Sequence, residues 1–299
     1  MLGLDFKVVS AIFRKDMRVY LGNPTGYVFI TLFIAATSAA AFLQEEFFSR
    51  NLADLATLNA VMPAILMFFV PAITMNAWAD ERRAGTDELL LTLPIRDGEV
   101  VLGKYLGVLG MYTLSLALTA GAQLSVLAVL GEPDKGLMFS TFAGYWLMGA
   151  LFAAIGLLGS MLTLNTTVAF ILGALGCAGL VFTGTLPWAS GLVGVVLCAL
   201  LAMLVWTAVR GSSAWAAAAG AVGGAVGILL WLLRGLSEAE VAETGLGDRF
   251  AELFGALSVD AHFTSFGEGV IRLGDVLYFT GGVIFLLYLC AFLLGRRNW

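Results

Sequence analysis

Residues 136–162 read GLMFSTFAGYWLMGALFAAIGLLGSML, and no charged side chain occurs in this stretch. A run of about 20 apolar residues in an α-helix is long enough to cross the hydrocarbon core of a bilayer. Residues 214–233 form a second run without any charge. Over the whole chain 60% of the residues are hydrophobic and 12% are charged, whereas soluble domains have about half and about a quarter. The sequence therefore predicts an all-α protein that crosses a membrane several times.

The apolar runs divide the chain into eight predicted membrane-spanning helices. They cover residues 24–43, 59–79, 100–130, 138–162, 166–187, 191–209, 213–234 and 275–294. With the N-terminus inside, eleven lysines and arginines fall in the inner segments and five in the outer segments. Positive residues concentrate on the cytoplasmic side of membrane proteins. We therefore expect both termini in the cytoplasm, and the chain in the cytoplasmic (inner) membrane of a prokaryote.

Three further segments complete a single predicted domain over residues 1–299. They are an N-terminal segment, a cytoplasmic loop and an extracytoplasmic segment, at residues 1–23, 80–99 and 235–274. In the first segment, helical periodicity places Lys7, Arg14 and Arg18 on one narrow face, with apolar residues opposite. We expect this amphipathic helix to lie in the cytoplasmic interface, with its cations toward anionic headgroups.

The cytoplasmic loop is the most informative part of the sequence. Its residues 79–94 read ADERRAGTDELLLTLP. Gly85 breaks the incoming helix, Thr86 is a suitable N-cap, and Pro94 stops a new helix about two turns later. The leucines of this short helix need an apolar surface to cover them. From the residues alone, that surface is either the cytoplasmic ends of the chain's own spans or another protein.

The loop resembles the signature of ABC-2-type transporter permeases. The matching positions are ERR-x-GT-x-ELL-x-x-x-P at residues 81–94 and GKYL at residues 103–106. Residues 162–169, with the pattern LT-x-N-x-x-VA, are similar to the turn between the family's fourth and fifth spans. The pattern HF-x-x-F-x-x-GVI-x-x-x-DVLY at residues 262–278, followed by RRNW at residues 296–299, resembles the gliding-motility-type branch.

The resemblance implies a fold, a mechanism and a set of partners. The fold is a bundle of six core helices, to which residues 188–234 add a helical hairpin. The loop is the coupling helix that docks on a cytoplasmic ABC ATPase subunit. Its expected ATPase contacts are Glu81, Arg82, Arg83, Gly85, Thr86, Glu88, Leu89, Leu90 and Pro94. A second permease, either a copy of this chain or a homologue, completes the membrane part.

The same resemblance locates the chemistry outside this chain. ATP and Mg²⁺ bind to the partner ATPase, so the chain is expected to have no catalytic residue, cofactor or metal of its own. An extracytoplasmic auxiliary subunit is an optional further partner, the lipid bilayer is the solvent, and no nucleic acid is implied.

Three patterns are weaker candidates for chemistry. Residues 98–105 nearly match a P-loop, but Tyr105 replaces the Ser or Thr that would hold Mg²⁺ and no strand precedes them. His262 is the only histidine, and no cysteine or acid stands at metal-ligand spacing from it. Glycine pairs with G-x-x-x-G spacing, such as Gly103 and Gly107, favour close packing of helices.

The predicted spans contain almost no ionisable side chain. Because membrane-embedded charges usually mark ion relays, an ion-coupled transporter is disfavoured. The resemblance implies a permease subunit that couples ATP hydrolysis by a separate ATPase to movement of an unidentified substrate. A non-transporting ABC-type complex, in which the chain transmits force or signal to an extracytoplasmic partner, stays open as the alternative. An intramembrane enzyme is the weakest hypothesis, because the spans lack convergent catalytic groups.

Overall fold

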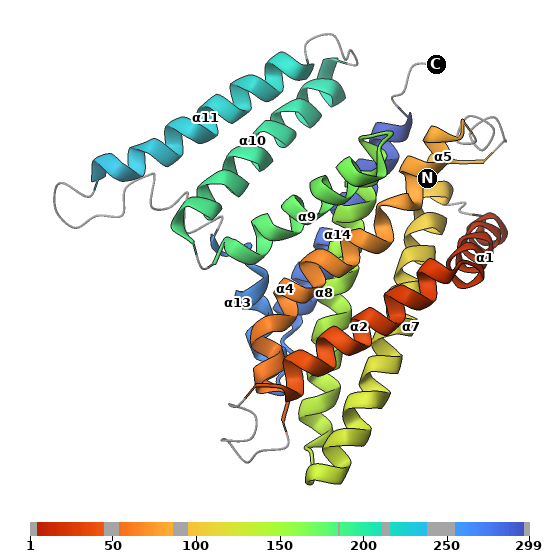
Figure 1. The fold of residues 1–299 in the computed structure, drawn as a ribbon. Helices are drawn as coiled ribbons and strands as arrows, with labels where there is room; N and C mark the ends of the chain where they lie inside the picture. The colour runs from red at the N-terminus through yellow and green to blue at the C-terminus, as the bar shows by residue number, and fades with distance from the viewer. Residues whose placement is uncertain are drawn as a thin grey trace. The chain divides into compact units, whose positions relative to one another are not determined.

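A computed structural model describes residues 5–44, 54–85, 95–184, 186–210, 216–237 and 255–295. These residues form α-helices and no β-strand (Figure 1). The helices are α1 (Phe6–Gly22), α2 (Pro24–Phe42), α4 (Ala56–Thr74), α5 (Asn76–Arg83), α7 (Asp97–Leu130), α8 (Lys135–Met161), α9 (Thr166–Phe182), α10 (Pro187–Arg210), α11 (Ala216–Ser237), α13 (Val259–Gly267) and α14 (Leu273–Gly295). The predicted all-α class is confirmed.

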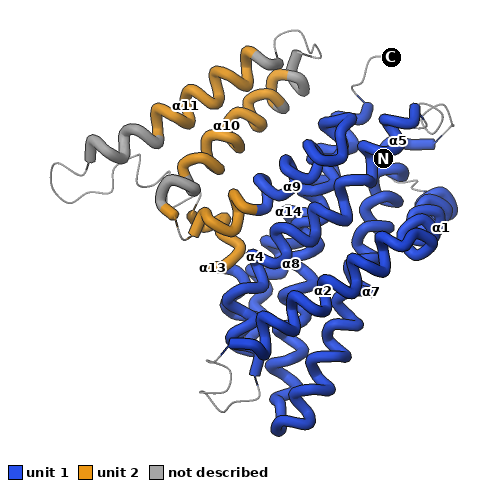
Figure 2. Tube along the Cα trace, viewed as in Figure 1, with its two compact units in different colours: residues 1–177, 262–299 blue, residues 178–261 orange. Residues whose placement is uncertain are grey.

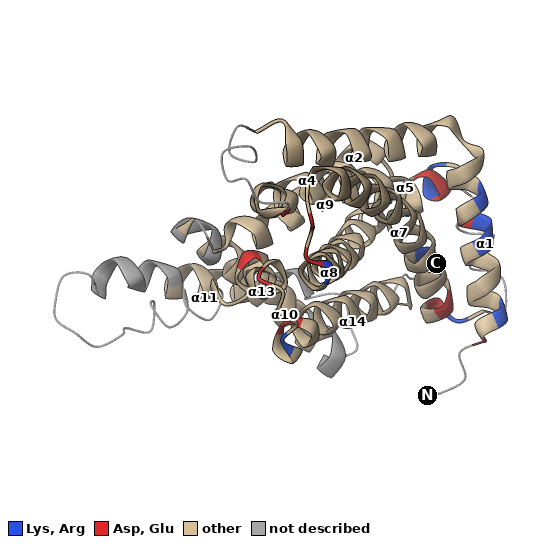
Figure 3. Ribbon diagram, turned by 90° about the horizontal axis from the view of Figure 1, so that it is seen from below, with Lys and Arg blue, Asp and Glu red and all other residues tan. Residues whose placement is uncertain are grey.

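Long apolar helices occur where the sequence predicts spans. In the described part of the chain, five are long and apolar enough to cross a membrane: Pro24–Phe42, Ala56–Arg83, Asp97–Leu130, Lys135–Met161 and Leu273–Gly295. Shorter apolar helical stretches cover Thr166–Phe182, Gly191–Met203 and Ala218–Leu230. Charged residues concentrate on α1 and near helix ends, while most of the length of α2, α4 and α8 carries none (Figure 3). A multi-pass membrane protein follows, and the count of eight spans stays a prediction.

Two predicted segments contain helical residues. Both ends of the predicted cytoplasmic loop 80–99 are helical, because α5 continues to Arg83 and α7 begins at Asp97. The bounds of the loop relative to the membrane stay a prediction. The predicted extracytoplasmic segment 235–274 contains α13. Residues 238–254 of the same segment lie outside the described residues.

The chain separates into two compact units (Figure 2). The first comprises residues 1–177 and 262–299, and the second comprises residues 178–261. The single domain expected from the sequence is neither confirmed nor excluded by this division and stays a prediction.

The core of the first unit is built around α8, the most deeply buried of the five long helices. It packs against α4, α7 and α14. Small residues on α8 let these neighbours approach closely. A Cβ atom on Gly149 would lie 2.2 Å from the Tyr112 ring, and a Cβ atom on Gly156 would lie 2.1 Å from Thr74 Oγ1. Glycine is therefore required at both positions by contact distance.

The second unit contains a tight antiparallel hairpin formed by α10 and α11. Glycines of α11 line the seam, and Cβ atoms on Gly223 and Gly227 would fall within 3 Å of Cys198 and Val195 of α10, respectively. The packing role predicted for G-x-x-x-G pairs is thus confirmed within the chain. The predicted hairpin at residues 188–234 corresponds to these two helices.

Gln123 is an unusual polar residue in the first unit. It is fully buried on α7, and neither amide atom has a hydrogen-bond partner among the described residues. An unpaired buried amide costs about 1–3 kcal/mol. Gln123→Met keeps the side-chain length, so it should raise the free energy of unfolding by roughly 1 kcal/mol, measured by denaturation in detergent micelles. Ser115→Ala is the control, because Ser115 already donates to the Met111 carbonyl; a gain in the control and none in Gln123→Met contradicts the prediction.

Candidate functional site

The candidate site lies where α1, α5 and α7 meet, next to residues 86–94. Helix α5 ends at Arg83, and Gly85 follows with a left-handed φ of 68°, which glycine adopts without steric strain. The prediction that Gly85 breaks the incoming helix is confirmed. Residues 86–94, with the expected coupling helix, lie outside the described residues. The roles of Thr86, Glu88, Leu89, Leu90 and Pro94 therefore stay predictions.

After residues 86–94 the chain continues into α7, and contacts at the start of α7 fix its position. The Glu99 carboxylate accepts a hydrogen bond from the Arg96 backbone N–H at 3.2 Å and another from the Asp5 backbone N–H at 2.9 Å. The first bond satisfies an N–H group at the α7 N-terminus, where an anion is favoured. The second joins the start of α1 to the start of α7. Glu99 therefore holds both helix ends in place.

Before residues 86–94 the chain forms α5, and contacts at the junction between α4 and α5 fix the direction of α5. Met75 separates the two helices, and Ser160 of α8 lies against the break. The Ser160 hydroxyl accepts from the backbone N–H groups of Trp78 and Ala79 and donates to the Met75 carbonyl, at 2.9–3.1 Å. Because buried backbone groups need partners, this hydroxyl stabilises the break and sets the direction of α5.

A buried lysine dominates the site. The Lys104 side chain is 1% exposed, although it lies in a predicted apolar span. Its Nζ lies 2.7 Å from Glu81 Oε2 and donates to the Ala77 carbonyl at 2.7 Å. It also lies 4.8 Å from the centre of the Trp78 ring, whose face attracts a cation. The Glu81 carboxylate, the Ala77 carbonyl and the Trp78 ring thus together compensate the buried ammonium group for its lost hydration.

Glu81 bridges α7 to α1. Its other oxygen, Oε1, accepts from Lys15 Nζ at 2.5 Å. Lys15, Asp16 and Tyr20 of α1 and Glu81 and Lys104 line a cavity of about 450 Å³. The Tyr20 hydroxyl donates to the Ile73 carbonyl at 3.2 Å. One carboxylate therefore ties three helices together at the base of residues 86–94.

The expected ATPase contacts that the structure describes fall into two groups: side chains that contact other parts of the chain, and residues that are exposed. Glu81 points into the chain toward Lys104 and Lys15, and the Arg82 guanidinium donates to the Met161 carbonyl at the end of α8. Arg83 and Gly85 are exposed. Sequence reasoning missed Lys15, Asp16 and Lys104 as members of the site. A lone lysine inside an apolar span was the available signal, because such a charge needs a partner.

The P-loop-like stretch has a different structure. Residues 98–105 lie within α7, so their backbone N–H groups point along a helix instead of surrounding a phosphate. The lysine of the pattern, Lys104, is the buried partner of Glu81.

A second polar cluster joins α13 to α14. Asp275 Oδ1 lies 2.8 Å from His262 Nδ1, and Asp275 Oδ2 accepts from the Ser265 hydroxyl at 2.5 Å. The His262 ring stacks on Tyr278 at 4.0 Å. The Ser265 hydroxyl donates to the Asp275 carboxylate and to the His262 backbone carbonyl, not to the His262 ring, so the ring is not placed as a base that would activate a nucleophile. The arrangement anchors α13, and sequence spacing did not reveal it.

Asp16 gives the site a testable pH dependence. Burial raises the pKa of its carboxyl above the ordinary value, and Lys104 and Lys15 counteract only part of that effect. The folded state then binds more protons than the unfolded state, so this group's contribution to stability falls as the pH rises through the window above about 4. Asp16→Asn removes the term. We expect the variant to gain stability relative to the native chain at pH 7 and to lose that gain toward pH 4. An unfolding free-energy difference that is the same at both pH values contradicts this.

Comparison with known proteins supplies the context for this site. A family profile described as "ABC-2 family transporter protein" matches residues 12–209. The chain is also 29% identical over 163 residues to the "Probable ABC transporter permease protein NosY" of Pseudomonas aeruginosa. That alignment covers 50% of this chain and 58% of the relative, so the chain spans little more than half of the relative's length. Neither comparison distinguishes the gliding-motility-type branch, which stays a prediction.

Proposed function

The chain belongs to the ABC-2 family of transporter proteins, and on that premise we propose that it is the transmembrane permease subunit of an ATP-driven transporter. The observation that carries the proposal is the junction of α1, α5 and α7, which lies on both sides of residues 86–94 and inside the matched region 12–209. ATP and Mg²⁺ belong to a separate cytoplasmic ABC ATPase. The substrate is an unidentified molecule that crosses the membrane.

The mechanism that we propose is mechanical. The ATPase docks on residues 85–94 and moves them when it closes on ATP. Arg83, at the end of α5, and Arg96, before α7, are the two points at which that movement enters the membrane part. The Glu81–Lys104 pair makes α5 and α7 move together, and Lys15 adds α1. A displacement of the short cytoplasmic segment then becomes a displacement of long helices.

The remaining partners and the location belong to the same proposal. The chain pairs with a second permease, either a copy of itself or a homologue. An extracytoplasmic auxiliary subunit is an optional further partner. It lies in the inner membrane of a prokaryote with both termini in the cytoplasm. Attachment of a thiol reagent that does not cross membranes tests the orientation, since Gly136→Cys, after the turn between α7 and α8, should react from outside and Ala84→Cys should not.

Coexpression with an ABC ATPase tests the central part of this function. The tagged chain is purified with a candidate ABC ATPase from the same organism and reconstituted into proteoliposomes. We expect stoichiometric co-elution and an ATP hydrolysis rate that depends on the chain. An ATPase variant without its P-loop lysine is the control, which should stay bound and not hydrolyse. An ATPase that elutes alone, with the same rate with and without the chain, contradicts the proposal.

A further inference from the structure

Helix α1 has three faces, not the two that its sequence predicts. One face is buried: Val9 and Ile12 pack on α7, where a Cβ atom on Gly103 would lie 2.8 Å from Ile12 Cβ. Asp16 belongs to the same face and lies against Gly107. Because α7 covers this face of α1, Val9 and Ile12 are unavailable to lipid.

The second face is basic and exposed. Lys7, Arg14 and Arg18 lie within an arc of about 40° at 3.6 residues per turn, and all three are exposed. None of them forms an ion pair with another described residue, whereas Lys15, on the neighbouring side of the helix, is paired with Glu81. This face therefore presents uncompensated positive charge.

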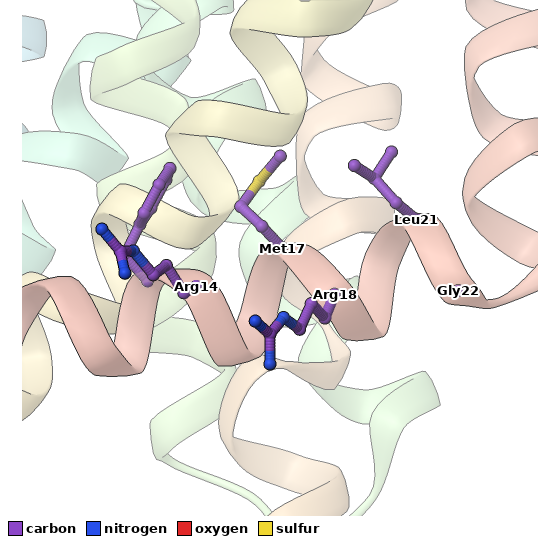
Figure 4. Close-up of a pocket in the computed structure, with 6 residues that line it drawn as sticks. Arg14, Met17, Arg18, Leu21 and Gly22 are labelled. Atoms are coloured by element: carbon purple, nitrogen blue, oxygen red, sulfur yellow. The ribbon is translucent and has the colours of Figure 1, made fainter.

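The third face is an open apolar groove between the other two. Phe13, Met17 and Leu21 repeat every four residues and, with Arg14 and Arg18, line a cavity of about 480 Å³. Figure 4 shows Met17 and Leu21 on one edge of α1, with Arg14 and Arg18 beside them. Phe13 and Met17 also border Gly110 of α7, so α7 closes the inner side of the groove. Phe6, seven residues or about two helical turns before Phe13, is 74% exposed.

The position of the groove places it at a membrane surface. Helix α1 ends at Gly22, and α2, a candidate span, begins at Pro24 after an extended Asn23. A helix that leads directly into a span lies at the level of the headgroups. The groove therefore has an apolar strip next to two guanidinium groups. This combination matches a molecule with an acyl chain and a phosphate.

We propose that this groove is a binding site for one anionic phospholipid. The acyl chain lies along Phe13, Met17 and Leu21, and the phosphate lies between the guanidinium groups of Arg14 and Arg18, which can each donate two parallel hydrogen bonds to its oxygens. Charge complementarity selects an anionic headgroup over a zwitterionic one. The apolar strip selects a lipid over free phosphate. Lys7 adds attraction to the anionic surface around the site.

Lipid binding to the purified full chain tests this proposal. Dioctanoyl phosphatidylglycerol is titrated into the chain in neutral detergent micelles, and bound lipid is counted by native mass spectrometry. We expect one preferential site. The double variant R14Q/R18Q should weaken binding at least tenfold, and L21N should weaken it while keeping the charge. Dioctanoyl phosphatidylcholine should bind at least tenfold more weakly, and inorganic phosphate should not compete.

The matched control is the double variant K135Q/R272Q. It removes the same amount of positive charge from two exposed residues: Lys135 is the first residue of α8, and Arg272 directly precedes α14. We expect it to bind phosphatidylglycerol like the native chain. Thermal unfolding of R14Q/R18Q should match the native chain, since both side chains are exposed. Equal lipid binding by R14Q/R18Q and the native chain, equal binding of the two lipids, or full competition by inorganic phosphate would each overturn the proposal.

Discussion

Replacement of Glu81 by Gln should destabilise the protein by about 3 kcal/mol or more, because it leaves Lys104 charged and without its carboxylate in a buried position. Lys104 is 1% exposed, and among the described residues it would keep direct contacts with the Ala77 carbonyl and the Trp78 ring, with the Asp16 carboxylate nearby in the same cavity. A buried charge that loses its directly paired carboxylate keeps the desolvation cost and loses most of the compensation. Denaturation of the purified chain in micelles measures the effect.

Two further variants make this result specific. Lys15→Gln removes the other partner of Glu81, but Lys15 is 53% exposed, so its loss should cost less than about 1 kcal/mol. Adding Lys104→Met to Glu81→Gln removes both charges, and the double variant should be more stable than Glu81→Gln alone. If Glu81→Gln costs no more than Lys15→Gln, the buried pair does not hold α5 to α7.

Gly149→Ala should also cause a large loss, of about 3 kcal/mol, which is the upper part of the range for overpacking a core. The added methyl group would lie 2.2 Å from two carbons of the Tyr112 ring. That ring cannot move easily, because it is fully buried and its hydroxyl donates to the Tyr145 carbonyl at 2.7 Å. Either α7 and α8 separate or this hydrogen bond breaks. Thermal unfolding in micelles measures the loss.

Gly121→Ala is the matched control for this prediction. Gly121 lies in α7 with no atom within 4 Å of an added Cβ, and alanine is the better helix former by up to about 1 kcal/mol. We expect the control to be as stable as the native chain or more stable. A Gly149→Ala variant that unfolds at the same temperature as Gly121→Ala would show that α7 and α8 do not pack as closely as described.

Local chemistry explains what the sequence could predict. Charge-free runs such as residues 136–162 allow one stable structure in a bilayer, the α-helix, since every backbone group must find its partner within the segment. Gly85 was identifiable as a helix end because glycine favours the left-handed conformation that the structure contains. Such signals depend on a residue and its immediate neighbours.

The candidate site depends on tertiary contacts, which local patterns do not encode. Glu81 was expected to face a partner, yet it contacts Lys104, 23 positions later in number, and Lys15, 66 positions earlier. The Ser160 contact with the α4–α5 break and the His262–Asp275 contact are of the same kind. For α1, periodicity located the basic face, but it could not show that α7 buries one part of the apolar face and leaves the other open.

The most direct measurement of the central claim is retention of the ATPase by variants of residues 86–94. If these residues form a coupling helix, Leu89 and Leu90 lie on its apolar face and Leu91 lies on the opposite side at 3.6 residues per turn. Leu89→Glu and Leu90→Glu should therefore abolish co-purification of the ATPase while membrane insertion and thermal stability stay unchanged, and Leu91→Glu should retain it. A complex that survives both Leu89→Glu and Leu90→Glu would contradict the claim that the ATPase docks on this segment.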